Sequence, residues 1–240
     1  MASVFFHGRV ESKLLVTMFK CCDQVFEHKY TTDIQNDPTR YLYFRIAQVA
    51  SYRSYEMFDQ DTKYRLADSY VLHCVALNQD GTFAIECLVP ITRIDIHNAD
   101  PISPNWWALP YTQFKEILHS ITSSPASSLD SHLIRLQAQD NGAYILNFNN
   151  LDYVIDLGGK HRLTMKFLTD VPNVSTQKVE MYHTVALGFQ DLDTAFRIFP
   201  PSYKHKGVIY YTYAKPILRM TWNNNDGLEI SIYIAGYSDV

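Results

Sequence analysis

Glycine and cysteine are scarce in this sequence, whose 240 residues include 9 Gly and 4 Cys. These counts exclude a collagen-like repeat and a disulfide-dense miniprotein. Long apolar runs are absent as well: Glu86 and Pro90 interrupt the run at residues 83–91, which falls short of the roughly 20 residues of a membrane-spanning helix. The first ten residues lack the apolar stretch of a signal peptide. We therefore expect no contact with a membrane.

A strong positive charge is also lacking, because the formal net charge is −4. No overall basic field draws the chain to nucleic acid, so any DNA contact requires Lys and Arg concentrated on one face. The chain is 47% apolar and 14% aromatic, which excludes disorder. Its length suits one large or two small domains with real cores.

Catalytic and metal-binding motifs are missing too. The nine histidines show neither H-x-x-x-H spacing nor a mixed Cys/His pattern. Residues 158–160 lack the flanking residues of a phosphate-binding loop, and no G-x-S-x-G occurs. Cys21 and Cys22 are adjacent and no C-x-x-C is present, as expected for reduced, partly buried thiols in a cytosolic or nuclear protein. We expect no metal, no cofactor and no enzymatic activity.

What is present is a set of hairpins around short polar turns. Alternating apolar and polar residues flank each turn, and Asn141-Gly142 is among the strongest hairpin signals. The alternation predicts antiparallel strands that are buried on one face. The three predicted hairpins pair residues 70–77 with 83–89, 133–138 with 144–148, and 217–222 with 228–234.

Helical spacing of apolar residues occurs between the hairpins. It predicts helices at residues 11–25, 111–121 and 191–199. Residues 52–65 lack a clean apolar stripe and form either a fourth helix or none. Further strands are expected at residues 4–8, 28–33 and 41–49.

The pattern lapses between residues 96 and 110, where turn residues such as Asp100, Pro101 and Pro104 accumulate. A boundary here leaves strands and a helix on either side. The sequence thus predicts an α+β fold of two similar domains, with antiparallel sheets and helices on one face of each. We expect domains at residues 1–97 and 110–240, joined by a linker at 98–109.

The second half resembles one domain of the eukaryotic and archaeal DNA sliding clamps, the family of proliferating cell nuclear antigen and the heterotrimeric DNA-damage checkpoint clamp. Residues 111–118 (YTQFKEIL) and the hairpin at 134–146 (IRLQAQDNGAYIL) are similar to that family's first helix and following strand–turn–strand. The strand at 182–189 leading into the helix at 191–199 resembles the family's last long strand and second helix. The match is one of order and spacing, as in a divergent subunit.

The resemblance implies a ring that encircles duplex DNA and tethers replication, repair or checkpoint proteins. The other subunits of that ring would be identical or different, and would pair with the strands at 182–189 and 161–168 or with the edge of the first domain. Client peptides would dock near residues 95–107 and the C-terminal strand. The location implied is the nucleus or a site of viral DNA replication.

A helical wall around DNA attracts phosphates without reading bases, so its Lys and Arg belong on exposed helix faces. The DNA-facing candidates are Lys13, Lys20, Lys115, His119, Arg197, Lys204 and Lys206. The alternative is that these lysines only solvate amphipathic helices. The partner-binding candidates are Ile102, Trp106, Trp107 and Tyr237. Exposed indoles favour interfaces, but burial of at least one of the two Trp is equally compatible with the sequence.

A second hypothesis comes from the richness in Tyr, Phe and Asn with many short strands. These features are also typical of a β-rich structural protein of the viral capsid or matrix type.

Overall fold

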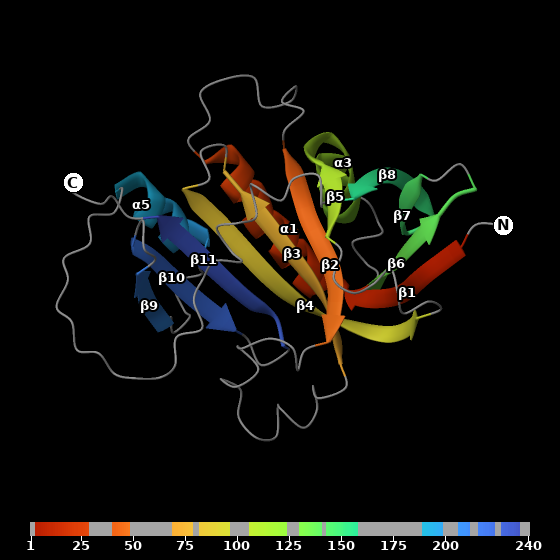
Figure 1. Ribbon diagram of the computed structural model, residues 1–240, viewed down its shortest axis with the longest axis horizontal. Coiled ribbons are helices and arrows are strands. Elements are labelled where there is room, and N and C mark those ends of the chain that lie inside the picture. Colours follow the sequence, from red (N-terminus) through yellow and green to blue (C-terminus); the bar gives the residue numbers. More distant parts are fainter. Residues whose placement is uncertain are drawn as a thin grey trace.

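The computed structural model describes residues 3–28, 40–48, 69–78, 82–96, 106–123, 130–140, 143–157, 189–198, 206–211, 216–223 and 227–235 (Figure 1). In chain order its elements are β1 (Ser3–Glu11), α1 (Ser12–Glu27), β2 (Tyr41–Gln48), β3 (Tyr70–Leu77), β4 (Phe83–Ile96), β5 (Trp107–Pro110), α3 (Tyr111–Ser123), β6 (Ser131–Ala138), β7 (Tyr144–Phe148), β8 (Leu151–Leu157), α5 (Phe189–Ile198), β9 (Lys206–Tyr211), β10 (Pro216–Asn223) and β11 (Glu229–Ala235). Among these described helices, none is long and apolar enough to cross a membrane.

Eight antiparallel strands close on themselves in the order β1-β6-β7-β8-β5-β2-β3-β4, because β4 pairs back with β1. The order of strand, helix and three strands occurs twice, as β1-α1-β2-β3-β4 and as β5-α3-β6-β7-β8. The pairs β1–β6 and β2–β5 join the two repeats. We call β1 to β8 with α1 and α3 the closed unit.

The remaining elements, α5 and β9 to β11, extend this sheet and form what we call the C-terminal unit. The closed unit and the C-terminal unit both pair with the 14-residue strand β4. Its first part, Phe83–Leu88, pairs with β11, and its second part, Ile91–Ile96, pairs with β1. The sheet therefore continues from the closed unit through β4 into β11, β10 and β9.

The three predicted hairpins are confirmed as the antiparallel pairs β3–β4, β6–β7 and β10–β11. The three predicted helices are confirmed as α1, α3 and α5, with ends that differ by at most two residues from the expected ones. α1 and α3 bury their apolar stripes in one continuous core with the strands, and α1 lies behind β2, β3 and β4 in Figure 1. The predicted α+β class, with antiparallel strands and helices on one face, is confirmed.

The prediction that the hairpin strands are buried on one face is right for β6 and wrong for β3, β4 and β11. β6 alternates between buried and half-buried residues, whereas every residue from Val71 to Leu77 of β3 is buried. In β11 the polar residues that alternate with apolar ones are also buried: Glu229 is 3% exposed and Ser231 is 1% exposed. On the face away from the helices these strands form a second apolar cluster of Tyr43, Val75, Leu77, Ala84, Ala108 and Tyr233, with Tyr41 and Trp106 packed against it.

Several expected elements lie outside the described residues. These are the uncertain helix at 52–65, most of the strand at 28–33, and the strands at 161–168 and 182–189. The domain limits, with a linker at 98–109, stay a prediction. Strands from the two predicted domains pair with each other in the closed unit, β1 with β6 and β2 with β5.

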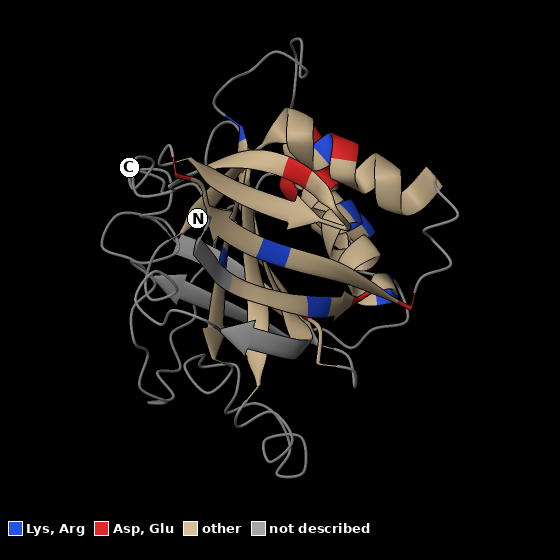
Figure 2. Cartoon of the chain, turned by 90° about the vertical axis from the view of Figure 1, so that its right-hand side faces the viewer, with Lys and Arg blue, Asp and Glu red and all other residues tan. Residues whose placement is uncertain are grey.

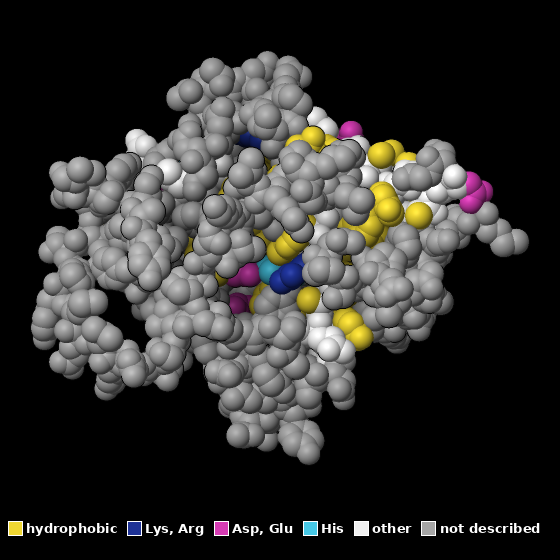
Figure 3. Space-filling view, viewed as in Figure 1, with side chains coloured by type: hydrophobic (Ala, Val, Ile, Leu, Met, Phe, Trp, Pro, Cys, Tyr) yellow, Lys and Arg dark blue, Asp and Glu magenta, His cyan; other side chains and the backbone are white. Residues whose placement is uncertain are grey.

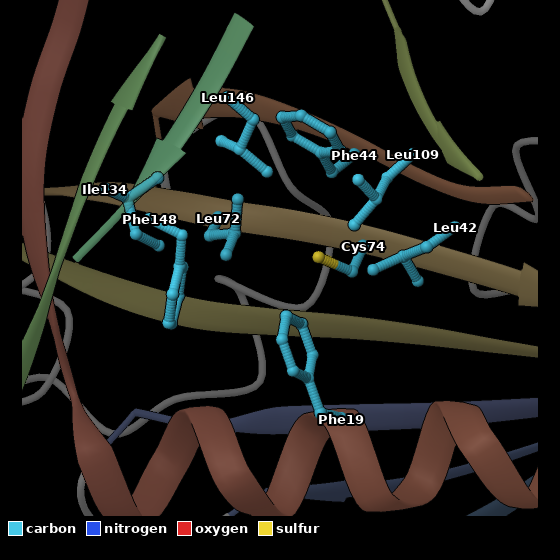
Figure 4. Close-up of a pocket in the computed structure, with 9 residues that line it drawn as sticks. All are labelled: Phe19, Leu42, Phe44, Leu72, Cys74, Leu109, Ile134, Leu146 and Phe148. Carbon is cyan, nitrogen blue, oxygen red and sulfur yellow. The ribbon is translucent and has the colours of Figure 1, made fainter. Parts of the chain in front are cut away.

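A cavity of about 20 Å³ lies inside the core, between α1 and the strands (Figure 4). Its lining is entirely apolar: Phe19, Leu42, Phe44, Leu72, Cys74, Leu109, Ile134, Leu146 and Phe148. A water molecule needs two to four polar partners in such a space, which this lining does not offer. The cavity is a packing defect of the core rather than a ligand site.

Candidate nucleic-acid interface

Helices α1 and α3 pack against each other in opposite directions on the helical side of the closed unit. The rings of Phe26 and Tyr111 lie 5.1 Å apart, at the end of α1 and the start of α3. Phe19, earlier in α1, lies 5.1 Å from Phe114, later in α3. These edge-to-face contacts fix the two helices side by side and leave one face of the pair toward solvent.

The solvent face of this pair carries three of the predicted DNA-facing residues in exposed positions. Lys13 and Lys20 of α1 and His119 of α3 are all exposed. His119 Nδ1 lies 3.1 Å from Ser123 Oγ, one turn further along α3. The first part of α1 and the last part of α3 thus present positive and polar groups next to each other.

Lys115 differs from Lys13 and Lys20, because its ammonium group forms ion pairs with carboxylates of the same chain. Its Nζ donates to both carboxylate oxygens of Asp23, at 2.9 and 2.8 Å, and lies 3.4 Å from Glu27 Oε1. Burial lowers the pKa of Lys115, but Asp23, together with Tyr111 and Glu27, outweighs this effect and leaves the pKa above its ordinary value. Lys115 bridges α3 to α1, and a phosphate would have to compete with two carboxylates for it.

The charges on the α1–α3 pair balance in number but are unevenly distributed. Three lysines (Lys13, Lys20 and Lys115) stand against three carboxylates (Asp23, Glu27 and Glu116). Figure 2 shows positively and negatively charged residues beside each other along the helices. Asp23 and Glu27 belong to the end of α1 that packs on Tyr111, Lys20 lies about one turn before Asp23, and Lys13 lies near the opposite end of the helix.

The remaining DNA-facing candidates are Arg197, Lys204 and Lys206. The guanidinium of Arg197 on α5 is largely exposed and forms an ion pair with Asp193 one turn earlier. Lys206 begins β9, and Lys204 lies outside the described residues. The roles of the seven candidates in DNA contact stay predictions.

Of the partner-binding candidates, Trp107 is only 2% exposed, and its ring contacts Tyr144 at 4.7 Å in the core. Its indole cannot serve as a docking surface, which agrees with the alternative that at least one of the two Trp is buried. Trp106 is half-buried, and Ile102 and Tyr237 lie outside the described residues.

Sequence reasoning missed two polar clusters that join the closed unit to the C-terminal unit. The first, the helix-side joint, consists of His28, Asp191 and Thr194: His28 Nε2 lies 2.6 Å from Asp191 Oδ1, and Thr194 Oγ1 lies 2.9 Å from His28 Nδ1. About 160 residues separate His28 from its partners, so no local pattern signals this contact.

The second, the outer-face cluster, consists of Arg45, His73, Glu86, Trp106 and Tyr233 on the opposite face of the sheet. His73 Nε2 lies 2.7 Å from Glu86 Oε1, and Tyr233 Oη donates to Glu86 Oε2 at 2.5 Å. Arg45 lies over the ring of Trp106. In Figure 3, histidine atoms lie between acidic and basic atoms near the centre of this face. The described residues hold no group of three or more His, Cys, Asp or Glu side chains arranged to bind a metal ion.

Comparison with known proteins gives matches by structure alone. No known protein family and no curated protein sequence matches this chain. The solved structure of the DNA polymerase III beta chain from Streptococcus pneumoniae is similar with a TM-score of 0.51 at 8% identity, over 98% of this chain and 66% of that chain. PCNA from Thermococcus kodakaraensis aligns over 97% of this chain and 100% of that chain, at 9% identity and a TM-score of 0.40.

The present chain thus spans 66% of the length of the bacterial beta chain. At 8% identity, the likeness establishes how the backbone is arranged and leaves DNA contact, assembly and partners to be argued from the residues. This backbone arrangement includes the closed unit, in which two strand–helix–three-strand repeats place paired helices on one face of the sheet. The chain has the fold of a divergent DNA sliding clamp.

Proposed function

We propose that this chain is a subunit of a sliding clamp that assembles into a ring around duplex DNA and tethers other proteins there. The single observation that carries the proposal is the pair α1–α3, packed side by side on one face of a closed sheet in a clamp fold. Such a face can line a central opening with helices, whose side chains contact phosphates without reading bases.

The charges on this face support a weak and non-specific grip. Lys13 and Lys20 supply the exposed positive charge, while Lys115 is occupied by Asp23 and Glu27. Contacts of this kind weaken with salt and let a protein move along the duplex. A subunit of this kind encloses and tethers; it performs no chemistry itself.

Assembly into a ring requires an edge that a neighbouring subunit can cover, and β8 offers one. Within the described residues, only Asp156 and Leu157 of β8 pair with β5, so the side of Leu151–Ile155 away from β7 has no described partner strand. Leu151 and Val154 on this segment are 54% and 55% exposed. An open edge with exposed apolar residues favours pairing with a strand of another subunit.

Size-exclusion chromatography with light scattering tests this assembly, on the chain alone and with candidate partner subunits. We expect a closed oligomer for the wild type and its loss in Val154→Glu. Phe196→Glu is the matched control, because Phe196 on α5 is an equally exposed apolar residue, at 58%, away from β8. A chain that stays monomeric with every partner contradicts ring assembly, and an equal loss in both variants contradicts the role of β8.

The tethered clients would dock near residues 95–107 and the C-terminal strand, where Trp106 is half-buried. We place the work of the chain in the nucleus or at a site of viral DNA replication, where duplex DNA is copied and repaired.

A further inference from the structure

The turn between β7 and β8 is tied to the start of β6 through Asn149. Asn149 and Asn150 both have a positive φ, at 48° and 70°, as the two central residues of a type I′ hairpin turn require. Asn149 N donates to Leu133 O at 3.0 Å, and Leu133 N donates to Asn149 Oδ1 at 3.0 Å. Asn149 Nδ2 lies 2.7 Å from His132 Nδ1. We call these contacts between Asn149 and β6 the turn anchor.

The turn anchor fixes the position of the proton on the ring of His132. A backbone N–H can only donate, so the atom of Asn149 that faces Leu133 is Oδ1, and the amide nitrogen Nδ2 faces the ring. Because an amide nitrogen also only donates, His132 Nδ1 carries a lone pair, and the proton of the neutral ring is on Nε2. The ring is fully buried and stacks on Phe148, with the centroids 5.4 Å apart.

The surroundings of His132 favour the neutral ring. Burial is the larger cause of its pKa shift and lowers the pKa below the ordinary value of 6.5. No charged side chain of any described element, the helices included, contributes to this shift. On β1, His132 is aligned with Val10, whose neighbours Arg9 and Glu11 belong to the opposite face of the strand.

The contact with Asn149 acts in the same direction as burial. An Asn side chain raises the pKa of a histidine where its oxygen faces the ring, but here that oxygen accepts from Leu133. With the folded pKa below 6.5, the neutral ring stabilises the folded chain. This contribution is complete above about pH 6.5 and is lost as the pH falls toward the lowered pKa.

We propose that the turn anchor is an acid-sensitive contact, in which protonation of His132 at Nδ1 displaces the carboxamide of Asn149 and takes the acceptor away from the Leu133 amide. A proton on Nδ1 would point at the N–H of Asn149 and set two donors against each other. Asn149 is the side chain that yields, because it is half-buried whereas the ring is enclosed in the core. Whether its carboxamide rotates or withdraws, Oδ1 no longer faces Leu133 N.

The turn itself keeps its shape in this response, because its internal contacts do not involve His132. Asn147 Oδ1 accepts from Asn150 N at 3.2 Å, and Asn147 Nδ2 donates to Asp152 at 2.7 Å. The bond from Asn149 N to Leu133 O needs no side chain either. Protonation therefore loosens the turn from β6 and leaves the β7–β8 hairpin folded.

The turn anchor also bears on assembly, a consequence that rests on the proposed function. Leu151, 54% exposed at the start of the β8 edge, directly follows Asn150. A looser turn gives this part of the edge more freedom, which a neighbouring subunit must remove when it pairs there. We therefore expect assembly to be weaker at acidic pH.

NMR of the whole chain between pH 7.5 and 4.5 tests the turn anchor. At pH 7.5 we expect the ring proton of His132 on Nε2, and the ring should titrate below pH 6.5. Through that titration, exchange of the Leu133 amide, corrected for its intrinsic pH dependence, should become at least tenfold faster, while the Leu136 amide in the middle of β6 keeps its protection. A proton on Nδ1 at pH 7.5, a ring that titrates at or above pH 6.5 or stays neutral down to pH 4.5, or an unchanged Leu133 amide would overturn the proposal.

Asn149→Asp is the matched variant, because a carboxylate accepts from Leu133 N and from a protonated Nδ1 alike, and Asp tolerates a positive φ. In this variant the ring of His132 should titrate above pH 6.5, and the Leu133 amide should keep its protection at the pH where the wild type loses it. The same acid response as in the wild type would contradict the role of Asn149. Should the variant fail to fold, the wild-type titration alone decides.

Light scattering at pH 7.5 and at the midpoint of the wild-type ring titration separates the turn anchor from assembly. We expect the wild-type oligomer to dissociate at the lower pH and Asn149→Asp to resist. Equal dissociation of both would show that the turn does not regulate the β8 edge. A chain that is monomeric at both pH values contradicts ring assembly alone, because the NMR result stands without it.

Discussion

Lys115 of α3 and Asp23 of α1 form the ion pair that connects the two helices of the proposed inner wall, with Nζ 2.8 and 2.9 Å from the carboxylate oxygens. The pair divides the predicted DNA-facing lysines into two kinds. Lys13 and Lys20 are exposed, whereas Lys115 is occupied within the protein.

Replacing Lys20 and Lys115 separately by Glu distinguishes these two kinds of lysine, because both substitutions change the charge by the same amount. Lys20→Glu should lower duplex affinity at low salt and reduce the slope of log affinity against log salt by about 0.9 per lost phosphate contact. Lys115→Glu should leave that slope unchanged and lower the free energy of unfolding by about 1 kcal/mol, a small value because the pair is partly exposed. Filter binding and denaturant unfolding measure the two effects. An equal reduction in the slope of log affinity against log salt in both variants would indicate that Lys115 contacts DNA, contrary to this prediction.

Substitutions of Ile232 test whether the C-terminal unit packs into the hydrophobic core. Its side chain is fully buried in β11, opposite Ile85 of β4 and Met220 of β10. Ile232→Asp places an unpaired carboxylate there and should unfold the C-terminal unit, at a cost of roughly 4 kcal/mol or more. Ile232→Val is the matched control and should cost about 1 kcal/mol. Denaturation followed by circular dichroism compares them, and similar midpoints for the two variants would show that this position is not in the core.

The four cysteines are free and buried, and we expect them to be chemically inert in the folded chain. Burial, with the neighbouring Cys22, raises the pKa of Cys21 to about 12, and burial also raises the pKa of Cys74 and Cys87. Since the thiolate is the reactive form, a disulfide reagent at pH 8 should modify no thiol in the native chain and four after unfolding. Rapid modification of one or more thiols under native conditions would contradict the burial of α1 against β3 and β4.

Cys74 lines the core cavity and offers a site for stabilisation (Figure 4). Cys74→Val adds a methyl-sized group toward the cavity and suits a strand, so it should raise the free energy of unfolding by about 0.5–2 kcal/mol. Cys87, its cross-strand neighbour, does not line the cavity, and Cys87→Val should give no such gain. Thermal unfolding compares the two. A lower melting temperature for Cys74→Val would mean that the space is already filled.

Local signals in the sequence predicted the elements well, because their causes are local. The Asn-Gly pair in the sequence at residues 141–142 and the alternation in residues 133–138 identify β6 and β7 from a short window. The spacing of Leu14, Leu15, Met18 and Cys22 does the same for α1, since it describes the face that the helix buries.

What the sequence could not indicate depends on contacts between distant strands. Ser231 and Glu229 look like solvent-facing residues of a hairpin, yet both are buried in the folded chain, where Ser231 Oγ lies 2.9 Å from Thr221 Oγ1 of β10. The pairing of Lys115 with Asp23 is equally invisible, because it requires α1 and α3 to lie side by side. An outward-facing lysine in a helical wheel therefore predicts exposure, and the tertiary structure decides whether its charge is available.

Electron microscopy of the assembled chain, with its partner subunits where it needs them, tests the central proposal most directly. The account predicts small closed rings with a central opening wide enough for duplex DNA, whose wall carries α1 and α3. Shells, flat sheets or isolated monomers, or rings in which α1 and α3 face outward, would contradict it.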